Sequence, residues 1–347
     1  MKTQTALGFL FAVTALAIGL SGCMGVAAVA ANYGAPRLAA PCTSGGAGSA
    51  QRRCESLTFG GTERNYRVYV PAKLAEPAPV IVVLHGATQN GAIMEVQTGK
   101  GFDHRADETG VLVVYPDSVG ARWNDGRREA APESGQKSTD DVAFLRALVA
   151  SLSQHYAIDS QRVFVTGFSN GGGMALRLAC EATEIFHGFV AVGANLSADV
   201  AQHCHPSDAR RVALIHGTAD LFNLYSGGTG GIYGRALSVE ATFDVFRAIA
   251  GCTGEESSPW PEGVRESQSN VILHRALGCQ GDLSVLLYQV KGGLHNWPGV
   301  SDETPRSFVS RDDAGAHLDA TAETWRFLGL PETHRETQIS IANSATR

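Results

Sequence analysis

A serine stands between glycines in the pentapeptide GFSNG at residues 167–171. The pentapeptide follows a run rich in β-branched and aromatic residues, 162–166, and precedes a helix-like stretch, 172–182. A sharp turn from strand to helix exposes a serine hydroxyl and directs the amide dipoles of the helix toward it, which is the geometry of a nucleophile elbow. Glycines and a serine at this spacing are a weak signal alone, so the prediction that Ser169 is a nucleophile depends on this placement.

A serine nucleophile needs a base to take its proton and a carboxylate to orient the base, and after such an elbow the acid precedes the histidine in the chain. The strand-like run VALI at 212–215 is followed by HGTAD, which places Asp220 in the next loop. The apolar run at 283–290 is followed by KGGLHNWPG, which contains His295. The sequence therefore predicts Asp220 as the acid and His295 as the base.

An acyl-transfer site also needs two backbone N–H donors for the oxyanion, one from the residue after the nucleophile and one from an earlier loop. Asn170 follows the serine and is the first predicted donor. The apolar run VIVVL at 80–84 is followed by HGATQN, in which a glycine lets the backbone turn back toward the elbow. Ala87 is the predicted second donor, and Thr88 is both the alternative donor and a candidate substrate contact.

Together these motifs resemble those of the secreted polyhydroxybutyrate depolymerase and feruloyl esterase group of α/β-hydrolases, which includes the LpqC-like esterases. The matching motifs are HGATQ at 85–89, WNDGR at 123–127, DDV at 140–142, GFSNGG at 167–172 and GLHNWPG at 293–299. The resemblance implies an α/β-hydrolase fold and a carboxylic ester substrate. That substrate is either a feruloyl or acetyl ester on plant polysaccharide or a short-chain hydroxyalkanoate ester.

Two positions depart from the pattern of these relatives. Ala87 stands where many of them have cysteine, and the segment LFNLY after Asp220 lacks the proline that is common there. Neither departure removes a catalytic atom, and both bear on the shape of the pocket.

Other histidines are weaker candidates for the base. His85 precedes the elbow and is expected to fix the end of a strand by hydrogen bonding. His216 ends a strand beside the acid loop and is the main rival, although a structural hydrogen bond suits it better. His317 is expected to enter the last helix. The triplet HCH at 203–205 has no second cluster to complete a metal site, so a disulfide explains its cysteine better and no metal is expected.

The pattern along the chain predicts one α/β catalytic domain at residues 51–330. Apolar runs alternate with helix-like segments, which is typical of a mostly parallel sheet with helices on both faces. The predicted strands are residues 66–70, 80–84, 111–115, 163–166, 189–193, 212–215 and 284–290. The clearest predicted helices are residues 139–156 and 238–250, and residues 331–347 are predicted to be a polar tail.

The first 22 residues read as an export signal of the lipoprotein type. Lys2 precedes an apolar core at 6–20, and LSGC at 20–23 resembles a bacterial lipobox, in which Cys23 becomes lipidated. A transmembrane helix is the alternative, but the apolar stretch is short and interrupted. The Ala, Gly and Ser-rich residues 23–50 read as a flexible tether. The protein is therefore expected in the periplasm or outside the cell, anchored to the envelope through lipid or released by cleavage near residues 28–31.

Six further cysteines, an even number, predict disulfides in an exported chain. Sequence neighbours give the simplest of the fifteen possible connectivities. The predicted pairs are Cys42 with Cys54, Cys180 with Cys204, and Cys252 with Cys279.

The net charge of −6, without a basic stripe, argues against a nucleic-acid partner. Arg127 and Arg128 either line a surface near the substrate mouth or face solvent, and the second is expected. Trp123 and Trp297 either flank the substrate pocket with flat aromatic surfaces or pack beneath the loops.

We therefore predict an acyl-transfer mechanism through a covalent acyl-enzyme, with an ester substrate and no cofactor. A lipoprotein of the same fold that binds a ligand or partner without turnover is the alternative from another class. A peptidase would use the same triad.

Overall fold

The computed structural model describes residues 49–127, 139–229, 234–299 and 318–332. The strands are β1 (Gln51–Phe59), β2 (Thr62–Val70), β3 (Ala78–Leu84), β4 (Leu112–Pro116), β5 (Ile158–Phe168), β6 (Gly188–Val192), β7 (Arg211–Gly217), β8 (Gly228–Thr229), β9 (Arg235–Ala236), β10 (Gly254–Trp260), β11 (Val271–Leu277) and β12 (Val285–Val290). The helices are α2 (Gly91–Gln97), α3 (Gly101–Thr109), α4 (Asp141–His155), α5 (Asn170–Glu181), α6 (Ala198–Ala201), α7 (Val239–Ile249) and α8 (Ala320–Phe327), with short 3₁₀ helices η1 (Val119–Ala121) and η3 (Glu266–Gln268).

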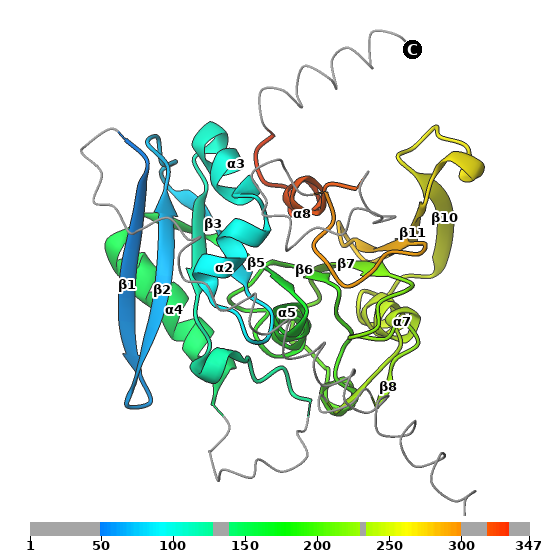
Figure 1. Cartoon of the computed structure of the whole chain (residues 1–347), viewed down its shortest axis with the longest axis horizontal. Coiled ribbons are helices and arrows are strands. Elements are labelled where there is room, and N and C mark those ends of the chain that lie inside the picture. The colour runs from blue at the N-terminus through cyan, green and yellow to red at the C-terminus, as the bar shows by residue number, and fades with distance from the viewer. Residues whose placement is uncertain (1–48, 128–138, 230–233, 300–317, 333–347) are drawn as a thin grey trace, which may run out of the picture. The chain divides into compact units, whose positions relative to one another are not determined.

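Most of the described strands form one sheet in the order β1-β2-β4-β3-β5-β6-β7-β12-β11-β10 (Figure 1). The six strands from β4 to β12 in this order are parallel to one another. Antiparallel strands extend the sheet at both ends, β2 and β1 at one and β11 and β10 at the other. The predicted mostly parallel sheet with helices is confirmed.

Apolar residues fill both faces of the central strands. In β3, Val80, Val82 and Leu84 face one core, while Ile81 and Val83 face the other. This alternation follows from the two-residue period of a strand, and a strand that is apolar at every position must be buried on both faces. The first core also contains residues of α4, α5 and α7, and the second contains residues of α2, α3 and α8.

The two helices predicted most clearly are each capped by a side chain at the amino end. The Asp140 carboxylate accepts a hydrogen bond from the Ala143 N–H at 2.9 Å at the start of α4. The Ser238 hydroxyl accepts one from the Ala241 N–H at 3.0 Å at the start of α7. Each cap satisfies a backbone donor that has no partner inside its helix.

The sequence did not predict three of the four antiparallel strands at the sheet ends, nor several helices. All seven predicted strands are present, but β1, β10 and β11 were not predicted. The strand β10 has the sequence GEESSPW and buries none of its residues fully, so it lacks the apolar run that marks the central strands. The helices α2, α3 and α6 were also not predicted, whereas α8 is the last helix that the sequence predicts near His317. The predicted signal peptide and nearly all of the predicted tether and tail lie outside the described residues, as do Cys23, Arg128 and His317.

Two disulfides have both cysteines within the described residues. Cys180, near the end of α5, is bonded to Cys204, and Cys252 after α7 is bonded to Cys279 after β11. The bonded cysteines are 24 and 27 residues apart in the sequence. In the chain-entropy description, closing a loop of this length stabilises the folded protein by about 3 kcal/mol, because it restricts the unfolded chain. The predicted partner of Cys54, Cys42, lies outside the described residues.

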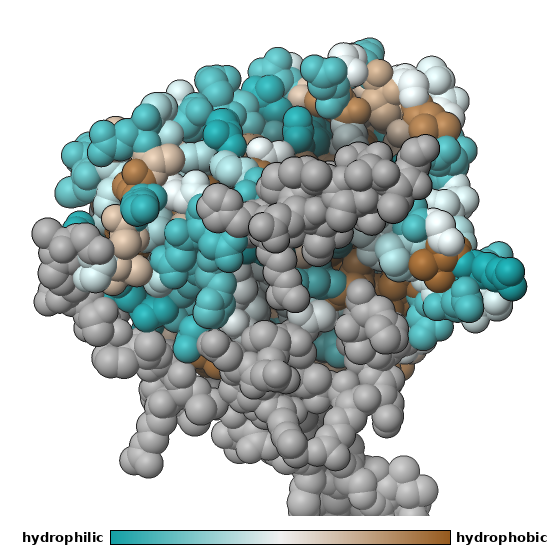
Figure 2. All heavy atoms as spheres, turned by 90° about the horizontal axis from the view of Figure 1, so that it is seen from above, coloured by the Kyte–Doolittle hydropathy of each residue, from teal (hydrophilic) through white to brown (hydrophobic). Residues whose placement is uncertain are grey.

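Figure 2 shows one face on which hydrophilic residues predominate and hydrophobic residues form small separate groups. Across residues 49–127, 139–229, 234–299 and 318–332, no helix is both long and apolar enough to cross a membrane.

A buried ionic cluster fastens the β1 end of the sheet to α2 and α3. Arg52 Nη2 lies 2.7 Å from Glu95 Oε1 and 2.8 Å from Asp103 Oδ2. Tyr115 donates a hydrogen bond of 2.8 Å to Asp103, and Arg67 lies 3.6 Å from Glu95. Burial, and then the nearby Asp103 charge, raise the pKa of Glu95 to about 7, because a buried carboxylate loses its hydration.

We predict that the free energy of unfolding falls as pH rises from about 4.5 to about 7, because across that range folded Glu95 holds a proton that the unfolded chain has lost. Glu95→Gln removes this contribution, so the decrease becomes shallower by an amount on the order of 1–3 kcal/mol. Urea denaturation at pH 5, 6, 7 and 8 measures it. Identical slopes in the two proteins would contradict the raised pKa.

Candidate active site

Ser169 lies at the turn between β5 and α5. Its backbone has φ 53° and ψ −119°, so a residue with a side chain occupies the left-handed side of conformational space. Such a conformation costs free energy outside glycine and is typical of the nucleophile elbow, where the surrounding structure holds it in place.

Glycines on both sides of the serine allow the tight turn. A Cβ atom at Gly167 would lie 2.4 Å from the backbone of Gly171, and one at Gly171 would lie 2.4 Å from the Leu84 carbonyl oxygen. Both distances are far below van der Waals contact, so only glycine lets the first turn of α5 approach β3 and β5 so closely. The spacing seen in the sequence therefore has a steric cause.

The structure brings the three predicted catalytic side chains together. His295 Nε2 lies 3.0 Å from Ser169 Oγ, and His295 Nδ1 lies 2.6 Å from Asp220 Oδ2. An ionised carboxylate can only accept, so Nδ1 carries the proton and Nε2 accepts from the serine hydroxyl. The three residues come from loops after β5, β7 and β12, which are parallel strands ending at the same edge of the sheet.

Asp220 is buried and its carboxylate is fully bound. Oδ1 accepts from the N–H groups of Phe222 at 2.8 Å and Asn223 at 2.9 Å, while Oδ2 faces His295. Burial alone would raise the pKa of Asp220, but hydrogen bonds from His216 and His295 outweigh it and hold the pKa below its usual range. Asp220 is therefore ionised at neutral pH.

His216, the rival for the base, lies beside the acid. Its Nε2 is 2.9 Å from the Asn223 carbonyl oxygen and 3.4 Å from Asp220 Oδ2. Its side chain is buried, and its ring packs edge-on against Tyr225. These contacts suit a residue that supports the acid loop.

The predicted oxyanion donors differ in availability. The Ser169 N–H donates to Val192 O at 2.8 Å, so it is already paired. Within the described residues, no acceptor is paired with the Ala87 N–H. Asn170 is the first residue of α5, so its N–H has no partner inside the helix. Thr88 fails as the alternative donor, because its N–H donates to Ala121 O at 2.8 Å.

Hydrogen bonds fix the loop that carries Ala87. Gln89 Oε1 accepts from the Gly86 N–H at 2.9 Å, and Gln89 Nε2 donates to Gln97 at 2.8 Å. His85 has the structural role predicted for it: its Nε2 accepts from the Ser118 N–H at 3.0 Å, and its Nδ1 lies 2.7 Å from Gly86 O. Burial lowers the pKa of His85 to about 4, so the ring is neutral at neutral pH.

The two tryptophans do not offer flat surfaces to a substrate. Trp123 is 1% exposed and Trp297 is 2% exposed. Trp123 donates to His85 O at 3.1 Å, and Trp297 donates to Thr321 Oγ1 at 3.0 Å and packs edge-on against Phe102. The indole N–H groups have partners beneath the loops. Of the two interpretations of the sequence, the structure agrees with the one in which the tryptophans pack beneath the loops.

Exposed apolar side chains gather instead on the loops that carry Asp220 and His295. The sequence marked the LFNLY segment after Asp220 by its missing proline, but the exposure of its side chains was not predicted. Among the described residues the exposed large apolar side chains are Leu221, Phe222, Leu224, Leu277 and Leu294, and all but Leu277 belong to these loops. The Phe222 ring lies 5.1 Å from the His295 ring, and the buried Phe168 ring lies 4.8 Å from it. Runs of apolar residues in a loop beside a predicted acid were the available signal.

Arg127 is buried, not solvated as predicted. It is 8% exposed and donates to Asp125 Oδ2 at 2.7 Å and to Asn223 Oδ1 at 2.9 Å. Asp141 braces the loop that leads to it, accepting from the Asn124 N–H at 2.7 Å and pairing with Arg64 at 2.8 Å.

No group of three or more His, Cys, Asp or Glu side chains that could hold a metal ion occurs in the part of the chain that the structure describes.

The fold is similar to that of solved esterases. An acetyl xylan esterase from Aspergillus awamori superposes with a TM-score of 0.53 at 17% identity, over 80% of this chain and 99% of that one. At this identity the likeness concerns the fold alone, and it confirms the predicted α/β-hydrolase fold.

Sequence comparisons give the family. The protein named "Putative esterase NocK" of Nocardia uniformis subsp. tsuyamanensis is 29% identical over 260 residues, 70% of this chain and 73% of that protein. Feruloyl esterase B of Piromyces equi is 25% identical over 63% of this chain, which spans only 39% of that enzyme. The family model described as Esterase PHB depolymerase matches residues 64–242, more than half of the chain. The chain therefore belongs to the esterase PHB depolymerase family and is a carboxylic ester hydrolase.

Proposed function

We propose that the protein is an exported serine esterase that acts through an acyl-enzyme. The observation that carries the proposal is the continuous hydrogen-bonded path from Ser169 through His295 to the ionised Asp220. As Ser169 Oγ attacks the ester carbonyl, its proton passes to His295 Nε2, and Asp220 stabilises the imidazolium that forms. The negative oxygen of the tetrahedral intermediate accepts hydrogen bonds from the Ala87 and Asn170 amides.

Collapse of this intermediate breaks the bond to the alkoxy oxygen, which leaves with the proton from His295 Nε2. A water molecule then attacks the acyl group on Ser169, and His295 takes the proton of the water as it took that of the serine. Release of the carboxylic acid returns the proton to Ser169. Because the base serves both steps, its orientation by Asp220 affects both acylation and deacylation.

The apolar side chains beside His295 bear on the substrate. Leu221 is 81%, Phe222 55% and Leu294 42% exposed, and such a concentration at a site favours contact with an apolar ligand group. We propose that these residues contact the acyl portion of the ester. Feruloyl or acetyl esters on polysaccharide and short-chain hydroxyalkanoate esters are the proposed substrates, in keeping with the names of the family and of its relatives.

The disulfides support export, because disulfides persist in oxidising compartments and are rare in the cytosol. The lipobox-like LSGC sequence supports a lipid anchor at Cys23. Mass spectrometry of the mature amino terminus tests the anchor.

We predict that the purified protein hydrolyses some of p-nitrophenyl acetate, butyrate and octanoate, methyl ferulate, and a β-hydroxybutyrate oligomer. Ser169→Ala lowers kcat by about 10⁴-fold or more, because the nucleophile is lost. Rapid mixing with p-nitrophenyl acetate tests the acyl-enzyme. A burst of p-nitrophenol before the steady state shows an acyl-enzyme whose deacylation limits turnover. The preferred acyl group divides the proposed substrate classes. Folded protein that neither turns over any of these esters nor reacts with a fluorophosphonate probe would favour the binding protein without turnover.

A pair of variants separates the two candidate bases. His295→Gln lowers kcat by roughly 10⁴-fold or more, because no other described ring lies within hydrogen-bond distance of Ser169 Oγ. His216→Gln lowers it by about tenfold or less, because it removes only support for the acid. Circular dichroism confirms that both variants are folded. Equal losses, or a greater loss in the His216 variant, would contradict the assignment of the base.

The acyl contact has its own test in Phe222→Ala. We expect kcat/KM for the butyrate ester to fall about tenfold and for the acetate ester much less, because a longer chain covers more of the ring. Leu277→Ala is the matched control, since Leu277 is 41% exposed but ends the strand β11 away from the catalytic loops. An equal effect on both esters would argue against the contact.

A further inference from the structure

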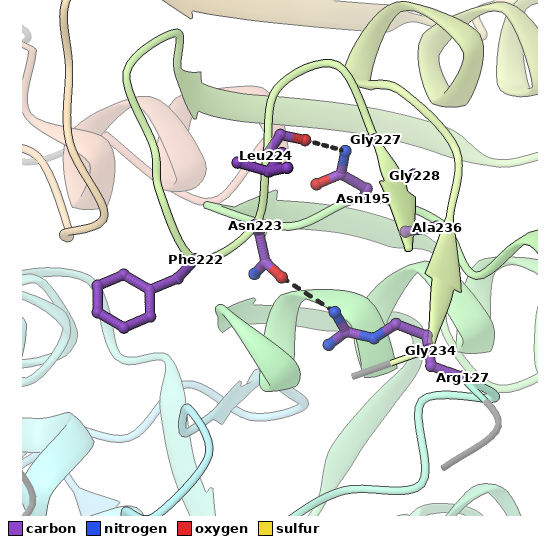
Figure 3. Close-up of a pocket in the computed structure, with 9 residues that line it drawn as sticks. All are labelled: Arg127, Asn195, Phe222, Asn223, Leu224, Gly227, Gly228, Gly234 and Ala236. Carbon is purple, nitrogen blue, oxygen red and sulfur yellow. Dashed lines mark hydrogen bonds between the residues drawn. The ribbon is translucent and has the colours of Figure 1, made fainter. Parts of the chain in front are cut away.

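Arg127 lies in the loop that follows η1 and contacts the acid loop, which is the loop that carries Asp220. Figure 3 shows its guanidinium directed at Asn223 at the side of a pocket that Phe222 and Leu224 also line. Its Nη1 donates to Asn223 Oδ1 at 2.9 Å, and its Nε donates to Asp125 Oδ2 at 2.7 Å. One buried cation therefore joins two segments that are 96 residues apart in the sequence.

Asp125 connects Arg127 to the nucleophile elbow. Asn170, the residue after Ser169, donates from Nδ2 to Asp125 Oδ2 at 2.9 Å. A Cβ atom at position 173 would lie 2.9 Å from the same carboxylate oxygen, so Gly173 leaves the space that Asp125 needs. The carboxylate thus lies at the first turn of α5, where the helix dipole favours a negative charge.

Asn223 connects Arg127 to the catalytic acid. Its backbone N–H donates to Asp220 Oδ1 at 2.9 Å, and its side-chain Nδ2 donates to the Gly193 carbonyl at 2.6 Å. Arg127 completes the side-chain contacts by binding Oδ1 of the same amide. The position of Asn223 therefore fixes one of the two N–H groups that orient the Asp220 carboxylate.

The loop after Asp220 needs such anchors because the side chains on both sides of Asn223 are largely exposed. Leu221 is 81% exposed, and Phe222 and Leu224 are 55% and 40% exposed. Asn223, between them, is 8% exposed, and hydrogen bonds rather than apolar contacts hold it. Without Arg127, the Asn223 amide would lose a charged partner in a buried setting.

We propose that Arg127 is a positioning residue of the esterase: it holds the Asp220 loop in register with the Ser169 elbow, through Asn223 on one side and Asp125 on the other. The inference rests on the proposed function, because it assumes that Asp220 orients His295. Arginine suits this place, since its planar fork holds two partners in fixed directions, whereas the ammonium of lysine is a compact point charge without that geometry.

The test compares Arg127→Met, Arg127→Lys and Asn223→Ala with the unchanged protein and with Ser169→Ala. Arg52→Met is the matched control, because Arg52 also pairs with buried carboxylates but lies in β1 at the end of the sheet. Each protein is assayed for kcat and KM on its preferred ester, for the rate of labelling by a fluorophosphonate probe, and for its urea midpoint.

We expect Arg127→Met to lower kcat by about 30- to 100-fold with KM changed less than about threefold, because a displaced acid misdirects the base without touching substrate. The labelling rate falls in parallel, and Arg127→Lys lies between. Asn223→Ala has a similar effect to Arg127→Met. A double variant that combines Arg127→Met with Asn223→Ala is little worse than either single variant, since both substitutions break the same contact. Arg52→Met lowers the urea midpoint and leaves kcat within about twofold.

Two results would overturn the inference while leaving the proposed function intact. A raised KM with unchanged kcat would make Arg127 a substrate contact. A lowered urea midpoint with unchanged kcat and labelling would leave it a structural ion pair only. Absence of turnover and of labelling in the unchanged protein would overturn the proposed function, and the inference with it.

Discussion

The close approach of α5 to β3 and β5 is the constraint on which the site depends. Ser169 can adopt its left-handed backbone only because Gly167 and Gly171 let the chain reverse within one turn. That turn brings the start of α5 against the end of β3. The loops after β7 and β12 then need only follow their parallel strands to the same edge. A local steric condition thus determines where distant parts of the chain must meet.

The central strands and the three side chains of the proposed triad could be predicted from the sequence, because each carries a local signal. The buried strands are uninterrupted apolar runs, and Asp220 and His295 each follow one. The strand β10 and the burial of Arg127 carry no such signal, since a polar edge strand and a solvated loop have similar composition. The role of the tryptophans was equally open, because an aromatic ring fits both a pocket wall and a core. Only tertiary packing separates these cases.

Buried charges occur where segments of different origin must be joined. Arg52 links β1 to α2 and α3 through Glu95 and Asp103, and Arg127 links two loops beside the site. Apolar contacts hold the sheet to its helices but do not specify direction, whereas a paired and hydrogen-bonded charge tolerates few alternative arrangements. Apolar contacts therefore hold the sheet and helices together, and the buried ion pairs determine how the segments are aligned.

The loop after Asp220 serves two purposes within a few residues. Its amides at Phe222 and Asn223 hold the catalytic carboxylate, while the side chains of Leu221 and Phe222 face outward beside His295. Backbone atoms do the first task and side chains the second. Substitutions at the outward positions can therefore change what the surface contacts while the carboxylate keeps its partners, whereas an inserted or deleted residue would alter both. Descendants of this chain are free to diverge in side chain at these positions but not in loop length.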